Sequence, residues 1–487
     1  MEQVYKRLFV GGDLSGIQKF LYNISSKKAA VSLKGRSYYL QQYMDNVCQN
    51  VVEAVKDAGA TEVDVIYNSG GKFYLITDNS AEIRNAVNCC AEDAQKELWC
   101  EHFGQLGISV SSVPFDENAD GTVNADGKQN AKPGYLWKTI TADFHRQKNQ
   151  KYKDLLLDNY DRYFEPLAVG GQTKVCAVTG IESSECVKEP LGNDNEEMYV
   201  LPSVKQQIQL GEELRNQQHF KTFEDYADGS KLGILRMDVD GLGKRFVEGF
   251  NSIKDYKVFS KRLVCFFEDK TQNIQKESEF REFLNIIYAG GDDLFVVGRW
   301  DKVISFAEHI HNEVEKEFGK DGITISGGIS IVNPKYPIAK AAESAGNAED
   351  AAKHFRDGEK NAIHFLGKTI SWEDEYSYVK SYQQQFVGLI ENNGLSKGIL
   401  HKLMLYASID EQNKEKKRDG KPEDFSYIWH VSYYLTRYIN RYKSNDEVCA
   451  FCRDLRDKQL DYRDTRRLEL IAISARWAEL ILKDHNK

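Results

Sequence analysis

Apolar runs that end at an aspartate and a glycine turn occur twice in this chain, far apart. Residues 8–20 resemble residues 234–246, because each segment starts with an apolar run, passes through Asp13 or Asp238, and then turns at a glycine. A short apolar run bounded by turn residues is typical of a buried strand. Each segment is therefore predicted to be a strand followed by a tight turn.

The likeness between the two parts of the chain continues downstream. Residues 65–76 resemble residues 286–297, and each pattern predicts a β-hairpin with a Gly-Gly turn. As a third match, residues 107–110 resemble residues 328–331. The matches keep one order, at offsets of 225, 220 and 221 residues (238 − 13, 290 − 70 and 328 − 107). We infer two copies of one domain, each an antiparallel sheet with helices on one face.

The predicted fold class is α+β, with two palm-like or ferredoxin-like domains. We expect a first palm at 1–117, a small irregular domain at 118–228, a second palm at 229–375 and a helical domain at 376–487. The β pattern stops after Trp372. A helical face is predicted by apolar residues spaced three and four apart: Leu470, Ile473, Trp477, Leu480 and Ile481. The charged run 411–424 is expected to be a solvated loop.

Composition narrows the class of protein. The chain has 487 residues, of which 41% are hydrophobic and 29% charged, as in ordinary globular proteins. No apolar run approaches the ~18 residues that would span a bilayer, so we expect a cytoplasmic protein without a membrane partner. Nine cysteines at irregular spacing are expected to be reduced thiols. A net charge of -9 argues against nucleic-acid binding by bulk charge, so any RNA contact must be local.

Three aspartates are the strongest candidates for chemistry. Asp238 ends a predicted strand, and Asp292 and Asp293 follow Gly290 and Gly291 at a predicted hairpin tip. If the strands are neighbours, the carboxylates converge and need a cation, for which oxygen ligands favour Mg²⁺ or Mn²⁺ and a phosphate substrate. The two glycines let backbone approach the phosphates closely. The alternative is a plain turn, since Gly-Gly-Asp-Asp is good hairpin chemistry by itself.

Further phosphate contacts are predicted on both sides of the hairpin. The turn after Asp238 is expected to offer backbone N–H groups to a triphosphate at a helix start. Its residues are Val239, Asp240, Gly241, Leu242 and Gly243. Downstream, Lys353 and Lys360 are candidates for the outer phosphates, with a solvated helix end as the alternative.

The motifs together resemble one known family, the large subunit ("Cas ten" family) of type III CRISPR effector complexes, and most closely its Csm-type branch. The resemblance covers nearly the whole chain. The motifs that carry it are Gly-Asp-Leu-Ser-Gly-Ile-Gln at 12–18, Lys-Gly-Arg-Ser-Tyr-Tyr-Leu at 34–40, Met-Asp-Val-Asp-Gly-Leu-Gly at 237–243 and Gly-Gly-Asp-Asp-Leu-Phe at 290–295. Gly-Gly-Asp-Asp alone also resembles diguanylate cyclases.

The resemblance implies two palm domains of nucleotidyl-cyclase type, a small intervening domain and a helical C-terminal domain. It implies antiviral defence, in which ATP becomes cyclic oligoadenylate when a complex of guide crRNA and other subunits binds target RNA. Asp292 and Asp293 would be the metal-binding pair and Asp238 the further metal carboxylate. The first copy has Lys72 and Phe73 at the positions of the pair. It is expected to hold no metal but to help bind a second ATP.

The sequence departs from the family pattern in two places. Many relatives begin with a His-Asp nuclease domain, but no His-Asp dipeptide occurs here, so we expect no DNase activity from this chain. Relatives often carry zinc between the palms, whereas Cys176 and Cys186 lack the second Cys of each pair, so we do not expect zinc.

A cluster of basic residues stands near the start of the chain, at Lys27, Lys28, Lys34 and Arg36. We expect it to contact RNA phosphates or a partner subunit, with a solvated loop as the alternative.

Two other functions remain open on sequence alone. The same site would also serve a different acceptor, giving a cyclic dinucleotide or an AMP conjugate. A catalytically silent scaffold that binds RNA is the non-enzyme alternative.

Overall fold

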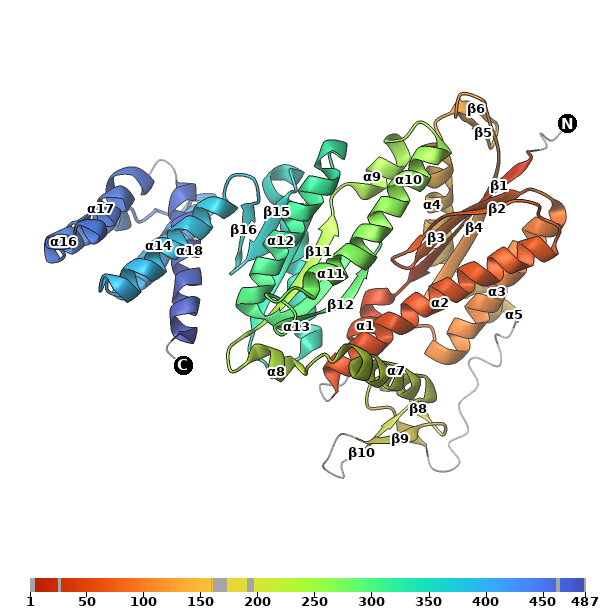
Figure 1. Ribbon diagram of the computed structural model, residues 1–487, viewed down its shortest axis with the longest axis horizontal. Helices are drawn as coiled ribbons and strands as arrows, with labels where there is room; N and C mark the ends of the chain where they lie inside the picture. Colours follow the sequence, from red (N-terminus) through yellow and green to blue (C-terminus); the bar gives the residue numbers. More distant parts are fainter. Residues whose placement is uncertain are drawn as a thin grey trace. The chain divides into compact units, whose positions relative to one another are not determined.

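The computed structural model describes residues 5–24, 28–158, 160, 173–190, 197–460 and 465–485. The chain divides into two compact units (Figure 1). The first contains residues 1–324 and 332–345, and the second contains residues 325–331 and 346–487. Among the described residues, no helix combines the length and the apolar character needed to cross a bilayer.

Two six-stranded sheets repeat one strand order. The first sheet has the order β2-β3-β1-β4-β5-β6 and the second β12-β13-β11-β14-β15-β16. The strands of the first sheet are β1 (Arg7–Ser15), β2 (Val63–Ser69), β3 (Lys72–Asp78), β4 (Gly107–Glu117), β5 (Val123–Ala125) and β6 (Lys128–Ala131). Those of the second are β11 (Leu232–Val239), β12 (Leu284–Gly290), β13 (Asp293–Arg299), β14 (Ile325–Val332), β15 (Ala362–Phe365) and β16 (Lys368–Ser371). The predicted α+β class with two palms is confirmed.

Helices cover both faces of the first sheet. Helices α2 (Ala29–Asp57), α3 (Ala81–His102) and α4 (Gly134–Asn149) pack on its strands. Two short helices, α1 (Ile17–Tyr22) and α5 (Lys153–Asp158), belong to the same part of the chain. Leu8 and Val10 of β1 lie in one core cluster with α2 and α3. Phe9, between them, packs against Trp137 of α4, with the two rings tilted by 52°. Neighbouring strand residues point to opposite faces, so β1 serves two cores. The expectation of helices on one face was wrong, because the apolar stripe of α4 was not recognised.

The segment between the palms combines short strands with two helices. Its elements are β7 (Lys174–Val175), β8 (Glu182–Ser183), β9 (Val187–Pro190), β10 (Glu197–Val200), α7 (Pro202–Gln218) and α8 (Phe223–Ala227). Helix α7 packs closely on α2 at two glycines: a Cβ on Gly35 would lie 1.9 Å from the Gln207 carbonyl oxygen, and one on Gly211 2.0 Å from that of Val31. The absence of side chains there lets the two backbones approach.

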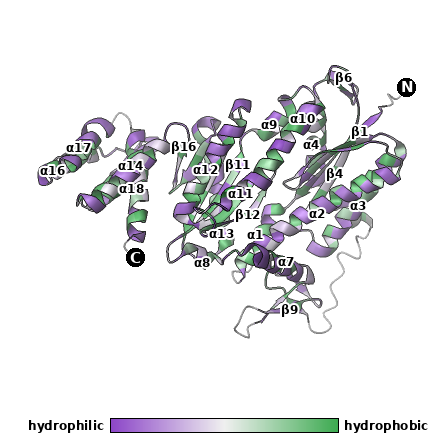
Figure 2. Cartoon of the chain, in the orientation of Figure 1, coloured by the Kyte–Doolittle hydropathy of each residue, from purple (hydrophilic) through white to green (hydrophobic). Residues whose placement is uncertain are grey.

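The helices around the second sheet include one π-helical turn. They are α9 (Leu242–Glu248), α10 (Ile253–Val264), the π-helix η1 (Cys265–Lys270), α11 (Thr271–Gln275), α12 (Trp300–Phe318), the 3₁₀ turn η2 (Gly319–Asp321) and α13 (Ile338–Lys353). Figure 2 shows hydrophobic and hydrophilic residues side by side on these helices, as expected for elements with one buried face.

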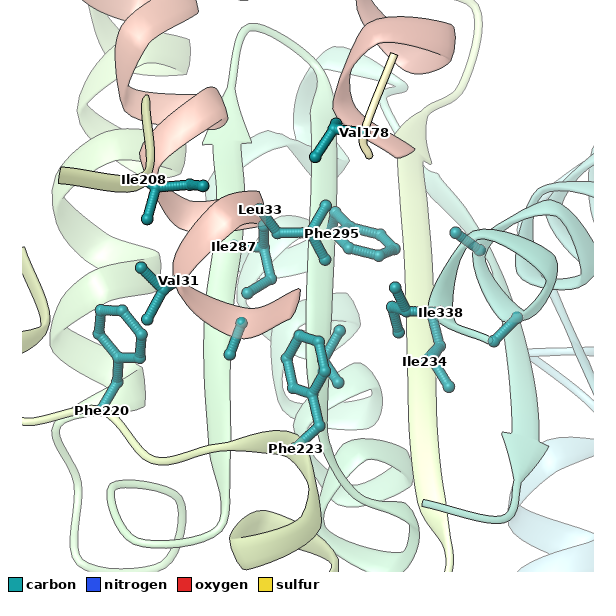
Figure 3. Packing of buried hydrophobic residues seen from close by; sticks show 14 of the residues in the cluster. Val31, Leu33, Val178, Ile208, Phe220, Phe223, Ile234, Ile287, Phe295 and Ile338 are labelled. Carbon is teal, nitrogen blue, oxygen red and sulfur yellow. The ribbon is translucent and has the colours of Figure 1, made fainter. Parts of the chain in front are cut away.

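One core cluster joins the first palm, the intervening segment and the second palm. Val31 and Leu33 of α2 lie in it with Ile287 of β12 and Phe295 of β13 (Figure 3). Phe223 of α8 belongs to the same cluster. Apolar burial therefore ties the start of α2 to the sheet of the second palm.

The second unit includes the 3₁₀ turn η3 (Phe355–Gly358) before β15 and continues as a helical domain after β16. The helices of that domain are α14 (Tyr376–Asn392), α15 (Gly398–Arg418), α16 (Ser426–Arg441), α17 (Asp446–Asp454), the π-helix η4 (Leu455–Gln459) and α18 (Thr465–Asp484). The prediction of a loop over 411–424 was wrong for its first part, because α15 runs through Arg418. Lys, Glu and Arg are good helix formers, so a charged run can stay helical.

Candidate active site at the second palm hairpin

The hairpin of the second palm brings two of the predicted carboxylates together. Strand β12 ends at Gly290, β13 begins at Asp293, and Gly291 turns between them with φ 69°. Asp238 on β11 is the register partner of Asp293. Their carboxylate oxygens lie within 4.8 Å of each other. Two half-buried carboxylates at this distance fit a hard divalent cation such as Mg²⁺ or Mn²⁺.

Asp292 occupies the turn itself and lies outside that carboxylate pair. Its backbone carbonyl accepts the Val239 N–H at 3.1 Å, which ties the hairpin to the end of β11. Burial raises the pKa of Tyr67 and of Tyr288 well above the usual range, and the negative charge of Asp292 raises both pKa values further. The side chain of Asp292 thus acts electrostatically on tyrosines of both palms.

The loop after β11 is fixed by Asp240. The buried Asp240 donates its N–H to the Thr324 carbonyl at 2.8 Å and accepts the Thr324 hydroxyl at 2.8 Å. Gly241 adopts φ 70° and precedes α9, whose Leu242 is buried. A Cβ on Gly241 or Gly243 would meet nothing within 4 Å. The backbone at these two glycines is therefore open to a ligand.

The two predicted phosphate lysines lie in the second unit. Lys353 ends α13 and pairs with the buried Glu349 one turn earlier, at 2.7 Å. Lys360 follows η3 and is half-buried, with φ 60°. Within this unit, Lys353 is held by an internal ion pair, and its role toward phosphate stays a prediction.

The first palm has the same hairpin without the acidic pair. Asp13 on β1 is the register partner of Lys72, as Asp238 is of Asp293. Gly71 and Lys72 therefore stand at the positions of Asp292 and Asp293, so the expected alignment of Lys72 and Phe73 was one residue out. The error arose because sequence identity favoured matching the two Gly-Gly pairs.

The cation of Lys148 takes the place beside Asp13 that a metal would need. Lys148 on α4 pairs with the Asp13 carboxylate at 2.6 Å. A lysine ammonium that already neutralises the carboxylate makes a second cation unfavourable there.

Both hairpins also share a backbone irregularity that the sequence did not reveal. The pairing register shifts between Val65 and Tyr67 in the first sheet and between Ile286 and Tyr288 in the second. A β-bulge at the same place in both copies extends the internal repeat to the level of backbone geometry.

Sequence reasoning missed the residues by which the first palm touches the second hairpin. The Ser69 hydroxyl accepts the Gly291 N–H at 2.9 Å and donates to Glu268 Oε1 at 2.6 Å. Gly70 packs so closely that a Cβ on it would lie 2.8 Å from Gly291 Cα. The sequence carried no signal for this contact, because the sequence repeat paired Gly70 with Gly290 and only the strand register makes Gly70 equivalent to Gly291.

The basic cluster near the start of the chain is occupied by internal contacts. Lys28 pairs with Glu189 at 3.1 Å and Glu212 at 2.8 Å. Lys34 and Arg36 are buried, and Arg36 donates to backbone carbonyls of α1 and its C-terminal end. The expected contact with RNA or a partner is therefore not supported at these three residues. Lys27 lies outside the described residues.

Fold and site together define a protein with two palm domains, of which the second carries the carboxylate pair. A family model described as "Cas10/Cmr2, second palm domain" matches residues 231–364, and one described as "Csm1 subunit domain B" matches residues 6–166. The chain belongs to the Cas10/Csm1 family.

One relative is the "CRISPR system single-strand-specific deoxyribonuclease Cas10/Csm1 (subtype III-A)" of Enterococcus italicus, which is 28% identical over 422 residues. The match covers 73% of this chain and 53% of the relative. The chain thus spans about half the length of these curated relatives from Enterococcus italicus and Mycobacterium tuberculosis.

Solved structures share the fold. The Csm1-Csm4 cassette in complex with cA4 has a TM-score of 0.67 and 19% identity, covering 98% of this chain and 70% of that one. The cassette in complex with AMPPNP has a TM-score of 0.64 and 18% identity, and the match covers 96% of this chain and 70% of that one.

Proposed function

We propose that the second palm is a metal-dependent nucleotidyltransferase that converts ATP to cyclic oligoadenylate. The observation that carries the proposal is the Asp238–Asp293 carboxylate pair, with oxygens within 4.8 Å at a glycine hairpin. Such a pair is costly without a cation, and a cation there suits a phosphate substrate. The first palm lacks the pair, so the chemistry belongs to one of the two copies.

Different residues of the chain would bind the metal ion and the phosphates during nucleotidyl transfer. Asp238 and Asp293 would hold a divalent ion, which when bound would neutralise phosphate charge and lower the pKa of an attacking hydroxyl. Gly241 and Gly243 leave room for phosphates beside the backbone, because their α-carbons face open space. Two nucleotides held close together between the palms would react faster because the attacking hydroxyl and the phosphate are already near each other.

Structural neighbours support ATP as the substrate and cyclic oligoadenylate as the product. Cassettes of the same fold have been crystallised with AMPPNP and with cA4. We extend this to propose that the chain works as a Csm-type large subunit with guide crRNA, target RNA and a Csm4-like neighbour. An antiviral, RNA-triggered cyclase accounts for both the fold and the carboxylate pair.

The test uses the chain purified with whatever subunits and RNA accompany it. ATP, Mn²⁺ or Mg²⁺ and matching target RNA are added, and the products are resolved by mass. We expect cyclic oligoadenylates from the wild type and a loss of at least about 100-fold in Asp238→Asn and Asp293→Asn, since metal neutralisation supplies several kcal/mol.

Asp13→Asn is the matched control, because it removes the equivalent aspartate of the first palm. It should retain the product. Detection of an AMP conjugate or a cyclic dinucleotide would mean that the same site transfers the nucleotide to a different acceptor. A complex that holds RNA and consumes no ATP would contradict the proposal and favour a scaffold.

A further inference from the structure

The hairpin turns of the two palms are in close contact at Gly70 and Gly291. A Cβ on Gly70 would lie 2.8 Å from Gly291 Cα, and a Cβ on Gly291 would lie 3.0 Å from Gly70 Cα and 2.9 Å from the Tyr67 hydroxyl. Ordinary side chains cannot occupy either position at these distances. The two turns are therefore in backbone contact, and a shift of the first displaces the second.

One side chain bonds across this contact. Ser69, the last residue of β2, is 9% exposed, and its hydroxyl accepts the Gly291 N–H at 2.9 Å. The same hydroxyl donates to Glu268 Oε1 at 2.6 Å. A serine hydroxyl has one proton, so giving it to Glu268 directs the oxygen lone pairs toward the Gly291 N–H.

Glu268 reaches Ser69 from an irregular helical turn. It lies on η1, the π-helix between α10 and α11, and burial raises its carboxyl pKa. A single π-helical turn often occurs at a functional site, where it redirects a side chain. Here the turn directs a carboxylate of the second palm at the serine of the first.

The bond is asymmetric, although the fold is duplicated. Ser69 and Gly290 are the last residues of β2 and β12, the equivalent first strands of the two hairpins. The second palm thus keeps a hairpin with no side chain at Gly290 and Gly291, while the Gly291 N–H is satisfied by the first palm. A glycine turn is flexible by itself, so an external bond reduces its freedom.

We propose that Ser69, oriented by Glu268, is a positioning residue of the first palm that sets the carboxylate turn of the second. It holds Gly291, two residues before Asp293, and thereby sets the distance between Asp293 and Asp238. This inference rests on the proposed function for its catalytic meaning, but its effect on metal binding is independent of any product. The first palm then contributes to the site without ligating the metal.

The test compares Mn²⁺ affinity and turnover in matched variants. Mn²⁺ binding to the purified chain is titrated by electron paramagnetic resonance. Ser69→Ala should raise the Mn²⁺ dissociation constant about 3- to 10-fold, the worth of one hydrogen bond. It should raise the apparent KM for Mn²⁺ more than it lowers kcat at saturating metal. Ser69→Thr, which keeps the hydroxyl, should restore affinity to within about twofold of wild type.

Ser111→Ala is the control for a general loss of stability. Ser111 on β4 is 7% exposed and donates to Asp143 at 2.7 Å, so it also bonds a carboxylate within the first palm but does not contact the hairpin. It should bind Mn²⁺ as the wild type does. Glu268→Leu changes no residue of either hairpin and should also weaken Mn²⁺ binding. This second variant tests the proposal if Ser69→Ala folds poorly.

The outcomes separate the two proposals. Wild-type Mn²⁺ affinity in both Ser69→Ala and Glu268→Leu overturns the positioning role. Equal weakening in Ser111→Ala also overturns it, because the effect is then one of stability. A wild type that binds Mn²⁺ and makes no nucleotide product overturns the proposed function alone, and one that binds no Mn²⁺ overturns both.

Discussion

Lys34 is a residue of the first palm whose pKa is changed by burial against the second palm. It lies buried on α2, and its ammonium donates to the Ile286 carbonyl of β12 at 2.7 Å. Burial lowers the pKa of Lys34 to about 8, because the charged form loses its hydration. A lysine expected at a surface therefore sits inside the contact between the palms, immediately before the bulge of β12.

The titration of Lys34 should appear in the stability of the protein. Its pKa is about 8 when folded and about 10.5 when unfolded, so between these values the unfolded state binds more protons. The free energy of unfolding therefore rises with pH across that window. Relative to Lys34→Met, the wild type should gain roughly 2 to 3 kcal/mol between pH 7.5 and 10.5. Urea unfolding of both proteins at each pH measures the difference, and a difference independent of pH would contradict the burial of Lys34.

At the scale of elements, glycines decide where helices and turns can approach. Gly35 and Gly211 lie where α2 and α7 cross, with hypothetical Cβ atoms 1.9 and 2.0 Å from carbonyl oxygens of the other helix. A helical glycine normally weakens a helix, so its presence here is explained by the close packing. Since α2 also enters the core of the second palm, this crossing helps fix that core.

Gly35→Ala should destabilise the protein, although alanine is the better helix former. Its Cβ would overlap backbone, and we expect a loss of roughly 2 kcal/mol or more in the free energy of unfolding. Gly388 on α14 is the matched control, because a Cβ there meets nothing within 4 Å. Gly388→Ala should stabilise by about 0.5 to 1 kcal/mol. Chemical denaturation measures both, and equal signs would refute the packing argument.

At the scale of the molecule, the first palm, the segment between the palms and strands β11 to β13 of the second palm belong to one compact unit. The contacts that hold the carboxylate turn come from both palms, as the Ser69 and Gly70 contacts with Gly291 show. A ligand of the second hairpin should therefore stabilise the folded unit as a whole. Binding to the folded state alone raises stability by mass action.

Mn²⁺ should raise the Tm of the wild type. At about 100 times the dissociation constant the gain is about 2.7 kcal/mol. Asp238→Asn and Asp293→Asn should lose this shift, whereas Asp13→Asn should keep it because Asp13 pairs with Lys148 instead of a metal. Differential scanning fluorimetry with and without Mn²⁺ measures the shifts. A metal-induced shift that survives in both carboxylate variants would place the ion elsewhere.

The internal repeat was accessible from sequence because it rests on local patterns. Strands that end at Asp13 and Asp238 and hairpins with paired glycines follow from nearest-neighbour preferences. Where local preference was ambiguous, the interpretation failed. The charged end of α15 was predicted to be a loop, and α4 was missed within the segment 118–228, which was expected to be irregular. The end of α15 stays helical through the helix propensity of its Lys, Glu and Arg residues. Helix α4 packs on the first sheet, and a local window does not contain that contact.

The sequence by itself determined the duplication, the α+β class and the acidic hairpin, because strand alternation and turn chemistry depend on residues close in the chain. Only the tertiary structure decided which carboxylates pair, which basic residues are buried and how the palms touch. Ser69 and Gly291 are 222 residues apart, and nothing in the neighbourhood of either indicates the other. Contacts at that separation arise when apolar faces pack, so they depend on the folded core as a whole.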